Sequence, residues 1–274
     1  MESIKRVAAI HDISGYGRCS LTVALPVLSA MGAQCCALPA AYLSSHTGFE
    51  GFTFLDMTDQ MIPALEHWKA LGLHFDAIYS GFLGSAEQMD IVMRAKALFP
   101  RAMLMVDPVM GDHGVTYKTY TPEMCRNMTA LARRADLIVP NLTEAAIILA
   151  RPYESAPKTE GEALEWLQAL SDGGKRSVVL TGLVLSQGSI GLGWLDAKDS
   201  SSGTLQHPFI GGEYHGTGDL FSSVMLGYLL RDRSLAAAAD SAARFIGECA
   251  ALSAGEGTSR NQGVRFEALL GRLV

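Results

Sequence analysis

Short, near-continuous apolar runs alternate with longer helix-like segments along the first two thirds of this chain. Such runs are typical of parallel strands that are covered on both faces of a sheet. The runs are Arg6–Ile10, Gln34–Leu38, Asp76–Ser80, Met103–Val106, Leu137–Val139 and Ser177–Thr181. This alternation indicates an α/β fold.

The segments between these runs have helical patterns. They are Leu21–Met31, Asp56–Leu71, Ala86–Phe99, Pro122–Arg134, Glu144–Ala150 and Gly161–Leu170. Pro26 lies inside the first of them and is expected to kink or reset that helix. The alternation predicts a doubly wound, mainly parallel α/β sheet flanked by helices and joined by right-handed crossovers.

The pattern changes after Thr181. Ser189–Asp196 and Thr204–Ile210 predict a hairpin-like pair of antiparallel strands at one edge of the sheet, followed by helices at Leu220–Arg231 and Leu235–Ala251. No internal repeat and no Pro/Gly-rich linker divides the chain, so we expect a single domain over residues 1–274.

Composition narrows the class of function. Charged residues make up 18% of the chain and hydrophobic residues 49%, which excludes a disordered protein. A net charge of −6 with no run of Lys or Arg argues against nucleic acid or an anionic membrane as a partner. No apolar stretch is long enough for a membrane helix or a signal-peptide core, and five scattered cysteines suggest neither disulfides nor zinc. We expect a cytoplasmic protein.

A glycine-rich turn comes directly before the helix predicted at Leu220–Arg231. In Gly216-Thr217-Gly218-Asp219, successive backbone N–H groups at a helix N-terminus form a site for an anion. Asp219 would repel that anion, unless it accepts the proton of a hydroxyl that attacks phosphorus. The alternative is that Asp219 only caps the helix. Spacing alone leaves both interpretations open.

Two further polar clusters follow predicted strands. Asp107 and Asp112 lie in Asp107-Pro-Val-Met-Gly-Asp112, where two carboxylates could hold a divalent metal, directly or through water, or could belong to an ordinary charged loop. In Asn141-Leu-Thr-Glu144, Thr143 could be a helix N-cap with Glu144 favouring the helix dipole. Glu144 could instead orient metal-bound water.

The loops after the first two strands are less specific. Gly15-x-Gly17-x-x-Ser20 only partly matches a dinucleotide-binding fingerprint, and no acidic residue follows the second strand. No Walker A motif occurs in the chain. The histidine of Ser45-His46-Thr47-Gly48 is weak evidence when taken alone.

Taken together, these motifs resemble the ribokinase-like superfamily and, within it, the vitamin B6 kinases. The residues that carry the resemblance are G-T-G-D at 216–219, N-L-T-E at 141–144, D-P-V-M-G-D at 107–112, S-H-T-G at 45–48 and Y-S-G-F-L-G-S at 79–85.

The chain departs from the B6 kinase pattern at three places. Asp12-Ile13 stands where pyridoxal kinases carry Ser-His, and D-x-S-G-x-G is more similar to hydroxymethylpyrimidine kinases. Phe82 replaces a common Tyr, and Val139 stands where some relatives have Thr.

The resemblance implies ATP-dependent phosphorylation of the 5′-hydroxymethyl group of pyridoxal, pyridoxamine or pyridoxine. Asp219 would accept the hydroxyl proton, and the N–H groups of residues 216–219 would stabilise the transferring phosphoryl group. Mg²⁺ would be held by Asp112 and Glu144. The other implied contacts are Asp107, Asn141, Thr181 and Thr217 toward ATP, and Asp12, Ser14, His46, Thr47 and Phe82 toward the vitamin. The alternative for His46 is that it only shapes its loop.

A lid should exclude water from the site, and Gly111–Thr121 is the segment expected to form it. The resemblance also suggests a homodimer and leaves open a need for a monovalent cation. A hydroxymethylpyrimidine (phosphate) kinase and a non-catalytic pyridoxal-phosphate carrier are the alternatives. Finally, a carboxylate at Asp12 predicts a preference for pyridoxamine through an ion pair with its ammonium group. The rival interpretation has Asp12 contact the ring nitrogen or the 3-hydroxyl, which all three vitamers share.

Overall fold

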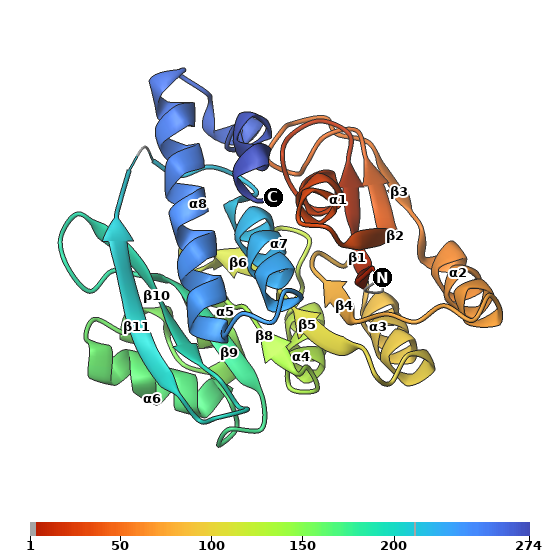
Figure 1. Ribbon diagram of the computed structural model, residues 1–274, viewed down its shortest axis with the longest axis horizontal. Coiled ribbons are helices and arrows are strands. Elements are labelled where there is room, and N and C mark those ends of the chain that lie inside the picture. The colour runs from red at the N-terminus through yellow and green to blue at the C-terminus, as the bar shows by residue number, and fades with distance from the viewer. Residues whose placement is uncertain (1–3, 211) are drawn as a thin grey trace.

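A mixed sheet of nine strands runs through the protein (Figure 1). The computed structural model describes residues 4–210 and 212–274. Met1–Ser3, at the start of the sequence that is too short in apolar residues for a signal-peptide core, lie outside the described residues. The strand order is β11-β10-β9-β8-β5-β4-β1-β2-β3. The bounds are β1 Arg6–Ser14, β2 Gln34–Leu43, β3 Phe54–Asp56, β4 Ala77–Ser80, β5 Met103–Val106, β8 Leu137–Ile138, β9 Ser177–Leu183, β10 Ser189–Leu195 and β11 Ser202–Pro208.

Helices cover both faces of this sheet. The bounds are α1 Leu21–Ala30, α2 Thr58–Ala70, α3 Ala86–Leu98, α4 Pro122–Ala132, α5 Leu142–Leu149, α6 Glu160–Leu170, α7 Thr217–Leu229 and α8 Leu235–Gly255, with 3₁₀ turns at Tyr153–Ser155, Arg260–Gln262 and Glu267–Arg272.

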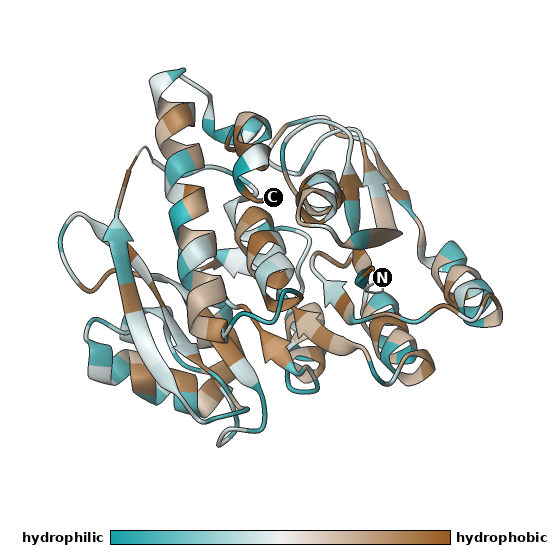
Figure 2. Ribbon diagram, viewed as in Figure 1, coloured by the Kyte–Doolittle hydropathy of each residue, from teal (hydrophilic) through white to brown (hydrophobic). Residues whose placement is uncertain are grey.

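Alternate residues of each central strand belong to different hydrophobic cores. In β1, Ala8 and Ile10 pack in the core under α2–α6, whereas Val7 and Ala9 pack in the core under α1, α7 and α8. The apolar residues of β5 and β8 appear brown at the middle of the sheet in Figure 2. This arrangement confirms the predicted doubly wound fold, because a sheet buried on both faces needs apolar side chains on both sides.

The edges of the sheet differ from the prediction. The antiparallel pair β10–β11 lies at one edge as expected, but β3 pairs antiparallel with β2 at the opposite edge as well. The residues of β3 are all exposed, so they lack the apolar signal of a buried strand. Helix α1 continues through Pro26 as a single element, so the expected reset does not occur.

Strands β1 and β2 extend beyond their predicted ends. The prediction stopped at Ile10 because His11, Asp12 and Ser14 are polar, yet all three are buried within β1. The register of β1 against β2 shifts between His11 and Ile13. Polar groups buried at the carboxyl end of a strand need partners or a function, and they direct attention to this edge of the sheet.

Strands β1, β2, β4, β5, β8 and β9 pair in parallel, so their carboxyl ends meet at one edge. Ligands of open α/β sheets bind at this edge. In the described ranges, none of the helices combines the length and apolar character needed to cross a membrane. The five cysteines form no disulfide there, as the sequence predicts.

Candidate active site

The glycine-rich turn is the first turn of α7 rather than a loop before it. Gly216 is the N-cap in the left-handed conformation, at φ 75°. A side chain at this position would overlap the carbonyl oxygen of Arg18, so only glycine allows the turn to pack against the loop after β1. The following N–H groups belong to a helix N-terminus, which can hold the oxygens of a phosphoryl group.

Asp219 does not cap this helix, because the N-cap is Gly216 and the cap has no side-chain hydrogen bond. The geometry therefore supports the interpretation of Asp219 as a base. Its side chain is 14% exposed. Burial and the nearby charge of Asp107 raise the pKa of Asp219 to about 8, and a hydrogen bond with the Ser20 backbone opposes the shift. A carboxylate with raised proton affinity is suited to accept a hydroxyl proton.

Asp107 lies beneath the same turn, directly after β5. The Ser222 hydroxyl of α7 donates to Asp107 Oδ2 at 3.0 Å. A methyl group built on Gly218 would lie 4.0 Å from the same oxygen. Burial raises the pKa of Asp107 to about 7. The structure thus brings Asp107 and Asp219 together at the carboxyl edge of the sheet, as the motifs predicted.

Glu144 closes a capping box at the start of α5. Asn141 is the N-cap: its Oδ1 accepts from the Glu144 N–H at 3.0 Å, and its own N–H donates to Glu144 Oε2 at 2.9 Å. Glu144 Oε1 accepts from the Met110 N–H at 3.2 Å. The alternative of Thr143 as the N-cap is wrong, since its Oγ1 accepts from the Gly114 N–H instead.

Buried carboxylates that repel one another make this site suitable for a cation. Burial and the charges of Asp107 and Asp112 raise the pKa of Glu144 well above its usual range. Asp112 itself has a side chain 48% exposed. Among the described residues, no three acidic, histidine or cysteine side chains gather closely enough to hold a metal by themselves. The donor set therefore fits Mg²⁺ held partly through water and phosphate oxygens, the usual mode for this ion.

The segment predicted as a lid forms a separate two-stranded ribbon, β6 (Gly111–Asp112) with β7 (Val115–Thr116). His113 lies in the turn of this ribbon, and its Nε2 is 3.3 Å from Oε2 of Glu213, a residue of the segment before α7. Tyr117 follows the ribbon, and burial and the charges of Glu144 and Asp112 raise the pKa of its phenol. The ribbon therefore borders the carboxylates, and its closure stays a prediction.

Asp12 is paired within its own segment. Ser20 Oγ donates to Asp12 Oδ1 at 2.5 Å, and Ser14 Oγ donates to Oδ2 at 2.8 Å. The residue is 4% exposed, and burial raises its pKa while the two hydroxyls oppose the shift. The carboxylate is nearly buried and each oxygen already accepts from a hydroxyl, which leaves it little surface for the predicted ion pair with an ammonium group. Asp12 instead fixes Ser14 and Ser20 beside the turn of α7.

His46 is paired in a similar way. The N–H of Gly48 donates to its Nδ1 at 3.1 Å, and its Nε2 lies 2.7 Å from the carbonyl oxygen of Asn261. Side chains at Gly17 or Gly48 would collide with the ring. Both ring nitrogens are used by the loops, so the geometry favours a loop-shaping role over the predicted substrate contact.

The remaining predicted residues lie around this edge. Thr181, inside β9, forms an isolated β-bridge with Asn141, the residue before α5, which places it beside the capping box. The Thr217 hydroxyl donates to the Tyr214 carbonyl oxygen at 3.2 Å. Thr47 is exposed, and Phe82 is partly buried with its ring 6.2 Å from that of Tyr120. None of these positions conflicts with the expected ligand contacts.

Three site residues escaped the sequence analysis: His11, Ser20 and Ser222. His11 is fully buried and its Nδ1 lies 3.8 Å from Asp219 Oδ1. The signal for His11 was its place directly before Asp12, beyond the point where the apolar run ends. Ser20 appeared only as the mismatched last position of the partial dinucleotide-binding fingerprint, and Ser222 carried no signal, because serines in or beside helices are common.

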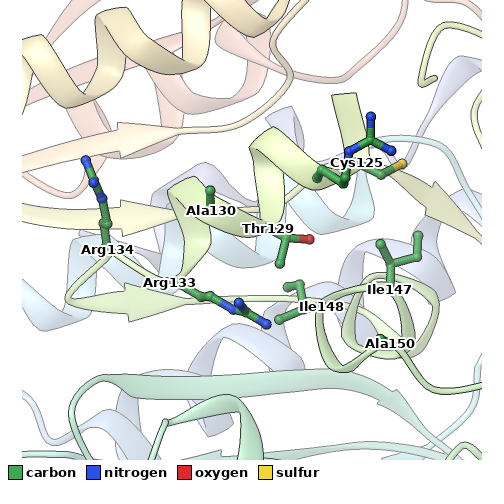
Figure 3. A pocket seen from close by; sticks show the side chains of 9 residues that line it. Cys125, Thr129, Ala130, Arg133, Arg134, Ile147, Ile148 and Ala150 are labelled. Carbon is green, nitrogen blue, oxygen red and sulfur yellow. The ribbon is translucent and has the colours of Figure 1, made fainter. Parts of the chain in front are cut away.

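The structure also has two surface hollows. None of the four site carboxylates, Asp107, Asp112, Glu144 and Asp219, lines either of them. The larger, of about 590 Å³, lies between α4 and α5 and is lined by residues including Cys125, Arg133 and Ile148 (Figure 3). The other, of about 450 Å³, is lined by Tyr16, Arg18 and residues near the C-terminus. The carboxylate cluster is therefore recognised from its chemistry rather than from the size of a cavity.

Comparisons with known proteins agree with this geometry. Residues 26–263 match the family described as phosphomethylpyrimidine kinase. The chain is 29% identical over 259 residues to the pyridoxal kinase PdxY of Pseudomonas savastanoi pv. phaseolicola, covering 90% of this chain and 88% of that protein.

Solved structures give the same result. A Bacteroides thetaiotaomicron protein, provisionally described as a phosphomethylpyrimidine kinase and crystallised with pyridoxal, has a TM-score of 0.93 and 39% identity, covering 99% of this chain and 96% of that one. Pyridoxal kinase from Lactobacillus plantarum has a TM-score of 0.88 and 32% identity, covering 99% and 97%. The chain therefore belongs to the phosphomethylpyrimidine kinase family and, within its ribokinase-like fold, to the vitamin B6 kinases.

Proposed function

We propose that this kinase transfers the γ-phosphoryl group of ATP to the 5′-hydroxyl of a B6 vitamer. The observation that carries the proposal is the position of Asp219, a carboxylate of raised pKa inside the first turn of α7. A base and an anion-binding helix N-terminus in one turn suit an alcohol that attacks a phosphoryl group.

Asp219 accepts the proton as the 5′-oxygen forms its bond to the γ-phosphorus and the bond to ADP breaks. The N–H groups of residues 216–219 stabilise the charge on the transferring oxygens. Asp107 supports the turn from below through Ser222. These steps need no covalent intermediate on the protein.

The nucleotide and its metal would lie beside α5. Glu144 and Asp112 would hold Mg²⁺ largely through water, and the ion would neutralise charge on the β- and γ-phosphates. Asn141, Thr181 and Thr217 would contact the nucleotide. The raised pKa of Glu144, caused by burial and by neighbouring carboxylates, supports a cation at this place.

The vitamin would enter between the loops after β1, β2 and β4. Ser14, Thr47 and Phe82 would contact it, with Asp12 and His46 shaping the loops. The proposal includes closure of the β6–β7 ribbon over the reacting groups. It also includes one kinase domain for the whole chain, a cytoplasmic location and a homodimer.

Hydroxymethylpyrimidine is a second candidate substrate. The family match and the D-x-S-G-x-G stretch at 12–17 favour it. A non-catalytic pyridoxal-phosphate carrier is less well supported, since such a protein needs neither Asp219 nor the capping box of Asn141 and Glu144.

The test is ADP production with pyridoxal, pyridoxine, pyridoxamine and hydroxymethylpyrimidine, each with Mg²⁺ and ATP. We expect the highest kcat/KM with one of the B6 vitamers and formation of its 5′-phosphate. A kcat/KM at least tenfold higher with hydroxymethylpyrimidine would reassign the substrate. Binding of vitamers without ADP production would indicate a carrier.

A further inference from the structure

His11 is a buried polar side chain beside the proposed base. It has no exposed surface, and in the described part of the chain neither of its ring nitrogens has a hydrogen-bond partner. Its Nδ1 lies 3.8 Å from Asp219 Oδ1. Among the described residues, no lysine or arginine lies within ion-pairing distance of the Asp219 carboxylate, so His11 is the basic side chain next to it.

The imidazole is held in place on two sides. The Tyr79 ring packs edge-on against it, with centroids 4.2 Å apart at 77°. On another side lies Gly81, where any side chain would overlap Nδ1 and push the ring away. Tyr79 and Gly81 belong to the Y-S-G-F-L-G-S motif, so part of that motif supports the histidine.

His11 is a neutral imidazole. Burial lowers its pKa to about 3. A neutral ring has one N–H donor and one acceptor, whereas the doubly protonated ring would be a buried cation. Several titratable groups lie near this ring and the Asp219 carboxylate: Asp12 of β1, Cys19 before α1, Tyr79 of β4, Asp107 after β5 and Tyr117 after the β6–β7 ribbon.

We propose that His11 is a positioning residue that holds the Asp219 carboxylate by donating from Nδ1–H to Oδ1. A small rotation of the Asp219 side chain closes the present separation and brings the two atoms within hydrogen-bond distance. Held in this way, the other carboxylate oxygen faces the incoming hydroxyl. A hydrogen bond to the ionised form also keeps Asp219 able to accept a proton at lower pH.

This inference rests on the proposed function. Its test compares His11→Asn with His11→Leu, two side chains with the same number of heavy atoms and the same branching at Cγ. The Asn amide nitrogen can take the place of Nδ1, whereas Leu has no donor. For His11→Leu we expect kcat to fall about 10- to 100-fold with little change in KM for the vitamin. The acidic limb of its kcat/KM profile should move up by about one pH unit, because an ionised carboxylate that loses a donor binds its proton more tightly.

His11→Asn should recover most of kcat and return the limb toward its wild-type position. Equal losses in both variants with an unmoved limb would overturn the proposal and leave His11 as a packing residue. Gly81→Ala is a second test that retains the histidine, in case His11→Leu does not fold. It should displace the ring and move the limb in the same direction, and an unmoved limb in Gly81→Ala would contradict the proposal.

A readout without substrate separates this inference from the function itself. If the wild-type enzyme turns over no B6 vitamer, the proposed function fails. The His11–Asp219 interaction is then measured from the unfolding temperature as a function of pH. The fall in Tm caused by ionisation of Asp219 should extend to higher pH in His11→Leu than in His11→Asn. Identical curves would overturn the interaction.

Discussion

The two ends of the active site handle buried charge in opposite ways. At the vitamin end, Asp12 and His46 have hydrogen-bond partners at both polar atoms of their side chains. At the proposed phosphoryl-transfer end, the charge of Asp107 raises the pKa values of both Glu144 and Asp219. No lysine or arginine in the described part of the chain is within ion-pairing distance of these three.

This difference separates residues that hold the loops in shape from residues that we expect to take part in phosphoryl transfer. Hydrogen bonds within the chain do not by themselves make a buried carboxylate part of the scaffold: both oxygens of Glu144 accept backbone N–H groups, yet the charges of Asp107 and Asp112 repel it. Carboxylates that repel one another make the folded state less stable, and a substrate, metal or proton relieves the repulsion. We therefore assign chemistry to the second group and shape to the first.

Removal of the proposed base, Asp219, should have the largest effect and is the strongest test of this division. Asp219→Asn should lower kcat by about 10²- to 10⁴-fold, because a positioned general base contributes that much. Binding of the vitamin should change little. Steady-state kinetics with a B6 vitamer check this, and a near-normal kcat would remove Asp219 from the chemistry.

The pH profile gives the next largest effect. Asp219 must be ionised to accept a proton, and its pKa in the free enzyme is raised to about 8 by burial and by Asp107. We expect kcat/KM to rise up to about tenfold per pH unit below that pKa and to level off above it. A profile that is flat from about pH 6 to pH 9 would contradict the raised pKa.

The Glu144→Gln variant tests whether the third carboxylate helps to hold Mg²⁺. Removing its charge should raise the Mg²⁺ concentration needed for half-maximal rate by about three- to tenfold, with a smaller effect on KM for the vitamin. Gln keeps one acceptor oxygen for the Asn141 N–H of the capping box and loses only the bond from the Met110 N–H, so the fold should persist. An unchanged Mg²⁺ titration would make Glu144 a helix cap alone.

The smallest effect concerns the vitamin end. Asp12→Ser should lower kcat/KM by a similar factor for pyridoxal, pyridoxine and pyridoxamine, because Asp12 acts through Ser14 and Ser20 rather than on the 4′ substituent. Factors that agree within about threefold would fit this role. A loss confined to pyridoxamine would restore the ammonium pair expected from the sequence.

Sequence patterns were sufficient to predict the fold and which polar residues lie at the carboxyl edge of the sheet. Buried parallel strands carry continuous apolar runs, and Asp107, Asn141, Glu144 and Asp219 follow strand ends in recognisable motifs. The partners of Asp12 could not be predicted, because Ser20 approaches it through a register shift and a turn that no local pattern encodes. His11 was missed for a related reason: a buried polar residue ends an apolar run although the strand continues.

The central claim is that Asp219 is an unsatisfied, destabilising carboxylate and Asp12 a satisfied, stabilising one. Replacing each by alanine tests both at once. The folded state of the wild type binds a proton on Asp219 up to about pH 8, whereas the unfolded state releases it near pH 4, so this group makes the protein less stable as pH rises between these values.

The most direct measurement is the free energy of unfolding of Asp219→Ala and Asp12→Ala at about pH 8, together with kcat. Asp219→Ala should be more stable than wild type by about 1–3 kcal/mol and lose at least about 100-fold in kcat. Asp12→Ala should be less stable by about 1–3 kcal/mol, because it leaves two buried hydroxyls without acceptors, and should lose less than about tenfold in kcat. Changes of stability in the same direction in both variants, or a greater loss of kcat in Asp12→Ala, would contradict the account.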